Sequence, residues 1–310
     1  IYIKEIKKFM KSNQKVKIAV VPVAGLGSRM LPATKAIPKE MLPVFDKPLI
    51  QYVVEEIINA EFDKIIFVTH SSKNSIENHF DDGFYLEDIS SKKNTRKNLS
   101  VLSSKSDKSI KIISVRQSEA KGLGHAILCA KPLLKNEPFA VILPDRIFYP
   151  KEKGKNLKKM KDSFETNQTS KILLENVESE DVSKFGIVKL NVEKNSKELN
   201  KIIDIVEKPE IDQAPSDLAV LGRYIFNYSI FDYLEKISKN SSGEFELTDA
   251  VKKMIKYEHV QGIESNDTCF DCGDKLGYAK AFYSISLENN LFSKDLLEFL
   301  KDLVKFKCEK

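Results

Sequence analysis

"AVVPVAGLGSRMLPATKAIPKEMLPVFDKPLIQY", residues 19–52, decides the fold. It begins inside the apolar run "KIAVVPVAG" (17–25), which is typical of a buried parallel strand that ends in a turn. Four basic residues follow the turn: Arg29, Lys35, Lys39 and Lys47. Three prolines between residues 32 and 43 stiffen this segment, so its cations lose little entropy when they bind an anion. The stretch therefore predicts a phosphate-binding loop, with a structural turn or a solvated linker as the alternatives.

The glycine turn "GLGSRM" (25–30) matches neither of the best-known phosphate loops. Met30 stands where a dinucleotide fingerprint needs its third glycine, and no Walker A lysine follows. Gly25 and Gly27 still allow backbone N–H groups to approach an anion closely. The turn lies directly after a buried strand, where open α/β sheets bind ligands.

Apolar strands and amphipathic helices alternate through the first half of the chain. Strands are predicted at 64–70, 111–117 and 139–145, and helices at 48–60 and 124–134. This order predicts an α/β fold, a Rossmann-like and mainly parallel twisted sheet with helices on both faces. The second half predicts a hairpin at 185–209, a strand at 219–226, and helices at 229–237, 247–257 and 276–287.

Composition excludes several classes of protein. The 50 basic and 45 acidic residues are dispersed and give a net charge of +5, which does not suggest a nucleic-acid partner. Four scattered cysteines indicate an intracellular, cytoplasmic protein without a disulfide framework. Cys269 and Cys272 form a lone C-x-x-C pair, too few ligands for structural zinc. No apolar run reaches the roughly 20 residues of a membrane span. The N-terminus lacks the features of a signal peptide, and Met10 could be the natural start.

Eight motifs occur in the order found in one family. They are the opening block (24–52), "RQSEAKGLGHAILCAKP", "LPD", "FGIV", "VEKP", "GRYIF", "GEFELTDA" and "FDCGDKLGYAKA". The chain resembles the bacterial UTP–glucose-1-phosphate uridylyltransferases over about residues 17–285. Three positions depart from the family pattern: Ser28 for threonine, Arg146 for an acidic or apolar residue, and Phe185 for tyrosine.

The resemblance implies transfer of a uridylyl group from UTP to glucose 1-phosphate, giving UDP-glucose and pyrophosphate. It also implies an N-terminal extension (1–16), a nucleotide-binding half (17–150), a sugar-binding half (151–290) and a C-terminal helix (291–310). Apolar residues recur at helical spacing in 291–306, so this helix is a candidate contact in a homodimer or homotetramer. Its apolar stripe could equally pack on its own domain.

The same resemblance assigns site residues one by one. Catalytic cations are Arg29, Lys39 and Lys208. Nucleotide contacts are Ala24, Gly25, Glu40, Gln117 and Gly122. Sugar-phosphate contacts are Gly186, Glu207, Lys208 and Gly222. Ligands of Mg²⁺ are Asp145 and Asp271.

Residue chemistry supports these roles, each with a plain alternative. Gln117 offers one acceptor and two donors, which suits the uracil edge, but it could simply end a strand. Asp145 ends an apolar strand, where ligands bind in open sheets, or it could cap a helix. Lys208 precedes Pro209 in a restricted backbone, or it is a solvated lysine. His125 is expected to be structural and not a base.

Two other functions compete with this interpretation. A thymidylyltransferase or another sugar-1-phosphate nucleotidyltransferase shares the looser motif pattern. A catalytically silent sensor of UDP-sugars should lack the metal carboxylates or the lysine pair, and this sequence keeps both.

Overall fold

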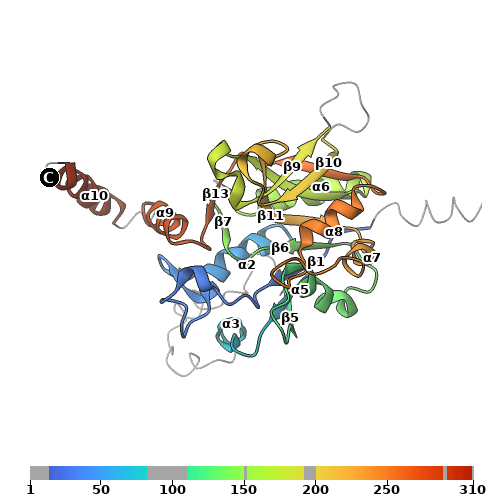
Figure 1. Cartoon of the computed structure of the whole chain (residues 1–310). Coiled ribbons are helices and arrows are strands. Elements are labelled where there is room, and N and C mark those ends of the chain that lie inside the picture. The colour runs from blue at the N-terminus through green and yellow to red at the C-terminus, as the bar shows by residue number, and fades with distance from the viewer. Residues whose placement is uncertain (1–13, 82–109, 150–151, 192–199, 289–291, 309–310) are drawn as a thin grey trace, which may run out of the picture.

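A mixed sheet of nine strands forms the centre of the computed structural model, which describes residues 14–81, 110–149, 152–191, 200–288 and 292–308 (Figure 1). Four neighbouring strands are parallel, and they lie in the order β5 (Lys111–Arg116), β4 (Lys64–Thr69), β1 (Ile18–Pro22) and β6 (Phe139–Ile142). The predicted N-terminal extension (1–16) falls mostly outside the described residues.

The second half of the chain continues the same sheet with mostly reversed strands. β11 (Leu218–Phe226) runs antiparallel to β6, to β8 (Ser170–Asn176) and to β9 (Gly186–Leu190). β9 and β10 (Ile202–Glu207) form the predicted hairpin, and β12 (Val260–Glu264) pairs in parallel with β8. The predicted α/β class is confirmed, with its parallel strands concentrated in the first half.

Helices cover both faces of the sheet, as predicted. α5 (Leu123–Ala130), α7 (Ile230–Leu234) and α8 (Leu247–Met254) share one hydrophobic core. α2 (Leu49–Asn59) and α6 (Lys155–Asn167) share the other. Successive strand residues alternate between the faces, so β1 places Ile18 and Val20 in the first core and Ala19 and Val21 in the second. Both faces are apolar because both are buried.

The remaining elements are short or lie at the edges. They are α3 (Asn74–His79), α9 (Lys275–Ser286), α10 (Ser293–Cys308), the ribbon of β2 (Pro43–Val44) with β3 (Lys47–Pro48), and the 3₁₀ turns η1 (Ser28–Met30), η2 (Lys39–Met41), η3 (Lys131–Leu133), η4 (Ser179–Lys184) and η5 (Ile211–Gln213). α10 extends away from the body of the molecule beyond α9 (Figure 1). In the described ranges, no helix is long and apolar enough to cross a membrane.

A second ribbon brings distant segments of the chain together. β7 (Arg146–Tyr149) pairs antiparallel with β13 (Thr268–Asp271), and the register sets Asp271 opposite Arg146. The backbone N–H of Cys272 donates to the carbonyl oxygen of Asp145 over 2.8 Å. The ribbon therefore places Asp271 beside Asp145, although 125 intervening residues separate them in the sequence.

Candidate active site

The turn after β1 is held by its own backbone. Gly27 has φ 70°, and its carbonyl oxygen accepts the N–H of Met30 over 3.1 Å and the hydroxyl of Thr34 over 2.8 Å. Ala24 is buried, whereas a Cβ added to Gly25 would meet nothing within 4 Å. The Gly25 backbone thus borders open space at the carboxyl end of the parallel strands, the edge where such sheets bind ligands.

Lys39 and Asp145 form the central ion pair of this edge. Lys39 Nζ donates to Asp145 Oδ2 over 2.8 Å, and both side chains are largely buried. Burial raises the pKa of Asp145, but the charges of Lys39, Arg146 and Arg29 outweigh it and hold that pKa well below its usual range. Burial lowers the pKa of Lys39, but Asp145 and Glu40 raise it above its ordinary value. Both groups are therefore charged near neutral pH.

Three charged side chains converge on Gly273. A Cβ placed there would lie 2.8 Å from Arg29 Nη2, 2.9 Å from Asp271 Oδ1 and 3.1 Å from Asp145 Oδ2. Both carboxylate oxygens thus lie within 3.1 Å of the point where a Gly273 Cβ would stand, so a side chain there would crowd them. The structure brings Asp145 and Asp271 together, as the resemblance implied, and adds Arg29.

Two departures from the family pattern contact each other. The Arg146 guanidinium lies 4.7 Å from the centre of the Phe185 ring, a cation–π contact. Arg146 Nη2 also lies 3.1 Å from Asp271 Oδ2. Arg146 therefore adds a cation beside the two carboxylates, and the missing hydroxyl at Phe185 leaves an apolar ring for it to cover.

Glu40 lies behind Lys39 in a buried ion pair that the sequence did not reveal. Lys73 Nζ donates to Glu40 Oε2 over 2.8 Å, and the two residues are 4% and 0% exposed. The other oxygen of Glu40, Oε1, is buried and has no hydrogen-bond partner among the described residues. Burial raises the pKa of Glu40, although Lys73 and Lys39 oppose it. Glu40 is fully buried, and its contact with the nucleotide stays a prediction.

Gln117 follows β5 and faces the start of α5. Its backbone N–H donates to Thr69 over 2.8 Å. Its side-chain nitrogen lies 3.2 Å from the carbonyl oxygen of Gly122 and 2.9 Å from Nδ1 of His125. Gly122 has φ 88° and caps α5, and a Cβ there would lie 2.9 Å from Phe245 O. The structure therefore groups Gln117 with Gly122 and adds His125.

The predicted sugar-phosphate contacts lie on the β9–β10 hairpin. Gly186 pairs with Glu207 across the hairpin, and a Cβ on Gly186 would lie 3.2 Å from Glu207 Oε2. That oxygen accepts the hydroxyl of Thr248 over 2.6 Å. Lys208 has φ 42°, and its exposed Nζ lies 3.7 Å from Glu207 Oε1. Gly186, Glu207 and Lys208 thus form one cluster with an exposed cation.

Gly222 supports the Asp145 loop from β11. Its φ is 69°, and a Cβ would lie 2.9 Å from the Leu143 side chain, whose close approach needs glycine. Its carbonyl oxygen accepts the N–H of Leu143 over 2.9 Å. A contact between Gly222 and the sugar stays a prediction.

Arg223 anchors the same loop on both sides of Asp145. It donates to the carbonyl oxygens of Leu143 and Arg146, each over 2.9 Å, and to Glu56 Oε2 over 2.7 Å. Arg223 is 0% exposed, so its charge depends on Glu56 from α2. We missed this pair in the sequence; the signal available was an arginine inside the apolar strand "AVLGRYIF".

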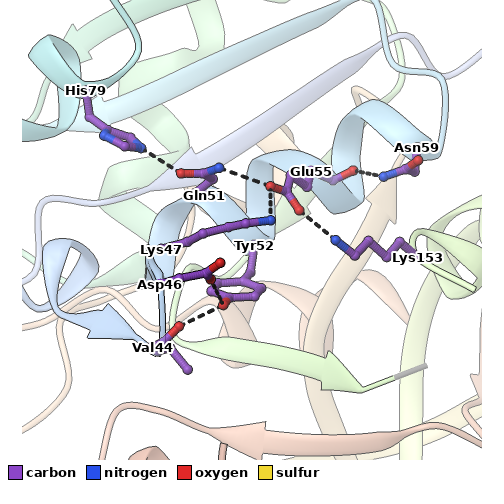
Figure 2. Close-up of polar contacts among 9 residues, drawn as sticks. All are labelled: Val44, Asp46, Lys47, Gln51, Tyr52, Glu55, Asn59, His79 and Lys153. Carbon is purple, nitrogen blue, oxygen red and sulfur yellow. Dashed lines mark hydrogen bonds and ion pairs between the residues drawn. The ribbon is translucent and has the colours of Figure 1, made fainter. Parts of the chain in front are cut away.

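Lys47 does not join the site. It donates to Glu55 Oε1 over 2.8 Å, and Gln51 and Lys153 donate to the same carboxylate, as Figure 2 shows. Lys47, Glu55 and Lys153 line a cavity of about 300 Å³ between α2, β7 and the start of α6, and Arg146 lines it too. The positive charge of the opening stretch is thus divided between two places.

Known proteins agree with this geometry. The chain matches the nucleotidyl transferase family over residues 18–287. It is 48% identical to the UTP–glucose-1-phosphate uridylyltransferase of Haemophilus influenzae over 93% of this chain and 99% of that one. A UTP-bound UGPase from Acinetobacter baumannii superposes with a TM-score of 0.83 and 39% identity, covering 93% of this chain and 99% of that one. A UDP-glucose pyrophosphorylase complexed with UDP-glucose superposes with a TM-score of 0.77 and 36% identity, covering 88% of this chain and 100% of that one.

The chain therefore belongs to the nucleotidyl transferase family and, within it, to the UTP–glucose-1-phosphate uridylyltransferases. The family resemblance and the enzyme class inferred from the motifs are confirmed.

Proposed function

We propose that this enzyme joins UTP and glucose 1-phosphate to give UDP-glucose and pyrophosphate. The observation that carries the proposal is the convergence of Arg29, Lys39, Asp145 and Asp271 at one edge of the parallel strands. The relatives support the substrates, since similar proteins are named for this reaction and similar structures hold UTP or UDP-glucose. A thymidylyltransferase is the less supported alternative.

The reaction needs charge and position more than proton transfer. A phosphate oxygen of glucose 1-phosphate forms a bond to the α-phosphorus of UTP, and the bond to the bridging oxygen of pyrophosphate breaks. The attacking oxygen is already anionic, because the second pKa of a phosphate monoester is about 6. Arg29 and Lys39 would bind the triphosphate and offset charge on the leaving group. Lys208 would bind the sugar phosphate, and Glu207 would bind glucose hydroxyls.

The residues present fit a magnesium ion. Mg²⁺ is usually held by one or two carboxylates together with phosphates and water. One oxygen of Asp145 and one of Asp271 each lie within 3.1 Å of the Gly273 Cβ position, so the two carboxylates are neighbours, and a low pKa keeps Asp145 ionised. When bound, the ion would neutralise negative charge on the phosphates. Among the described residues, no group of three or more histidine, cysteine or acidic side chains forms a fuller site.

Self-association and a cytoplasmic location complete the proposal. α10 exposes Leu297, Phe299 and Val304, an apolar surface that a second copy would cover. The four scattered cysteines, without a disulfide framework, support the cytoplasmic location. Light scattering on the full chain should give the molar mass of at least a dimer. A monomer at micromolar concentration would reject self-association.

Pyrophosphate release across a panel of nucleotides and sugar phosphates tests the function. UTP with glucose 1-phosphate should be the best pair. A preference for dTTP would favour the thymidylyltransferase. Binding of UDP-glucose without any turnover would favour the silent sensor.

A further inference from the structure

The amide of Gln117 is turned in one direction by two neighbours. Its Nε2 lies 3.2 Å from the carbonyl oxygen of Gly122 and 2.9 Å from Nδ1 of His125. A carbonyl oxygen only accepts hydrogen bonds, so the group that faces Gly122 is the NH₂ end of the amide. Both N–H groups of that end are then engaged, one with each neighbour.

This arrangement requires His125 to accept through Nδ1. The imidazole is then neutral, with its proton on Nε2. Burial lowers the pKa of His125, nearby Lys121 and Lys239 lower it further, and Glu119 opposes them. The ring lies stacked against Phe245, with centroids 6.4 Å apart.

The remaining polar atom of the amide is its oxygen. In the part of the chain that the structure describes, no hydrogen bond uses Oε1 of Gln117. Gln117 follows β5 at the carboxyl edge of the parallel strands, the same edge as the Gly25 turn after β1, two strands away. The amide therefore offers a ligand one acceptor and no free donor.

We propose that His125 is a positioning residue that determines base specificity, because its Nδ1 holds the Gln117 amide with Oε1 toward the base. The inference rests on the proposed function, in which Gln117 contacts the uracil of UTP. Oε1 accepts the N3–H of uracil, whereas N3 of cytosine is itself an acceptor and opposes it. The amide has no N–H left to donate to a uracil carbonyl. Gln117 therefore makes one hydrogen bond to uracil, through Oε1, although its amide group carries both donors and an acceptor.

Loss of the acceptor at His125 removes the shorter of the two hydrogen bonds that hold this orientation and leaves only the one to the Gly122 carbonyl oxygen. The amide can then rotate by half a turn more readily and present NH₂ to the base, which suits N3 of cytosine. One neutral hydrogen bond contributes about 1 kcal/mol, so the preference for UTP over CTP should fall by roughly 3- to 10-fold.

Two substitutions at position 125 distinguish the role of the hydrogen-bond acceptor Nδ1 from the role of the aromatic ring. His125→Phe keeps an aromatic ring against Phe245 but has no acceptor. His125→Asn gives up the ring but places an amide oxygen close to the position of Nδ1. The measured quantity is the ratio of kcat/KM for UTP to that for CTP, with glucose 1-phosphate as the second substrate and folding checked by thermal melting.

The ratio should fall in His125→Phe and stay within about twofold of wild type in His125→Asn. In the wild type it should also fall as the pH drops through the His125 pKa, because Nδ1 then becomes a donor, and His125→Asn should lack this dependence. An unchanged ratio in His125→Phe, or equal losses in both variants, overturns the inference while UTP turnover by the wild type upholds the proposed function. A wild type without preference for UTP overturns both.

Discussion

Alanine at position 273 would place a methyl group where the three charged side chains meet. Its Cβ would lie 2.8 to 3.1 Å from Arg29 Nη2, Asp271 Oδ1 and Asp145 Oδ2, whereas ordinary contacts begin at 3.4 Å. Each group must retreat by a few tenths of an ångström. All three are ends of side chains, and the φ of Gly273 is not in the left-handed region, so the fold should persist.

Gly273→Ala should lower the rate of the reaction much more than it lowers the stability of the fold. Metal sites tolerate about 0.2 Å in ligand distance, and a misplacement of about 1 Å costs about 100-fold in rate. Gly273→Ala should therefore lower kcat/KM by roughly 10- to 100-fold and raise the Mg²⁺ concentration for half-maximal activity. The assay is pyrophosphate release in a MgCl₂ titration, with thermal melting as the check on folding.

Cys272→Ala is the matched control. Cys272 is buried beside Gly273 in a separate cluster with Val44 and Leu49. This variant should lose stability but keep its Mg²⁺ requirement. Wild-type activity and Mg²⁺ dependence in Gly273→Ala would refute the assignment of the Asp145 and Asp271 carboxylates to the metal.

Three further predictions follow from buried or exposed charges. Arg223→Met leaves the Glu56 carboxylate buried without its partner and should lower the free energy of unfolding, measured in urea titrations, by about 3–5 kcal/mol. Adding Glu56→Gln should recover part of that loss. If the two substitutions are strictly additive in the double variant, the Arg223–Glu56 ion pair does not stabilise the fold. Burial lowers the pKa of Lys171 to about 8 from the ordinary 10.5. Between these two pKa values the unfolded chain binds more protons at Lys171 than the folded chain does, so the free energy of unfolding should rise with pH across that window, by at most about 3 kcal/mol. This rise should vanish in Lys171→Met. An equal pH dependence of stability in Lys171→Met and wild type would contradict the prediction. Lys208→Ala should raise the KM for glucose 1-phosphate by roughly 10- to 150-fold, with UTP binding by the free enzyme nearly unchanged; a collapse of UTP binding alone would reassign Lys208.

The pattern of apolar residues predicted where the strands and helices lie better than it predicted in which direction the strands run. The runs that became β1, β4 and β6 are largely apolar because both faces of the sheet are covered there, and the helices between the parallel strands require parallel pairing. β5 is an edge strand whose residues are exposed or only partly buried. β11 is equally apolar yet antiparallel to three neighbours. An apolar run carries no sign of its direction, so the mixed character of the second half was not visible in the sequence.

The site could be predicted where residues end parallel strands. Asp145 follows the buried strand β6 and Gln117 follows the edge strand β5, and the loops after parallel strands lie at one edge of the sheet. The pairs Arg223–Glu56 and Lys73–Glu40 could not be predicted, because their members come from elements that only the folded sheet brings into contact. The contact of Arg146 with Phe185 was likewise hidden, although both positions stood out as unusual.

The central claim is most directly tested by ³¹P NMR of the purified protein with UTP, glucose 1-phosphate and MgCl₂. Wild type should form UDP-glucose and pyrophosphate in equal amounts, and Asp145→Asn, with unchanged melting behaviour, should be slower by orders of magnitude. Wild type that consumes UTP without forming UDP-glucose, or Asp145→Asn that turns over at the wild-type rate, would contradict the account.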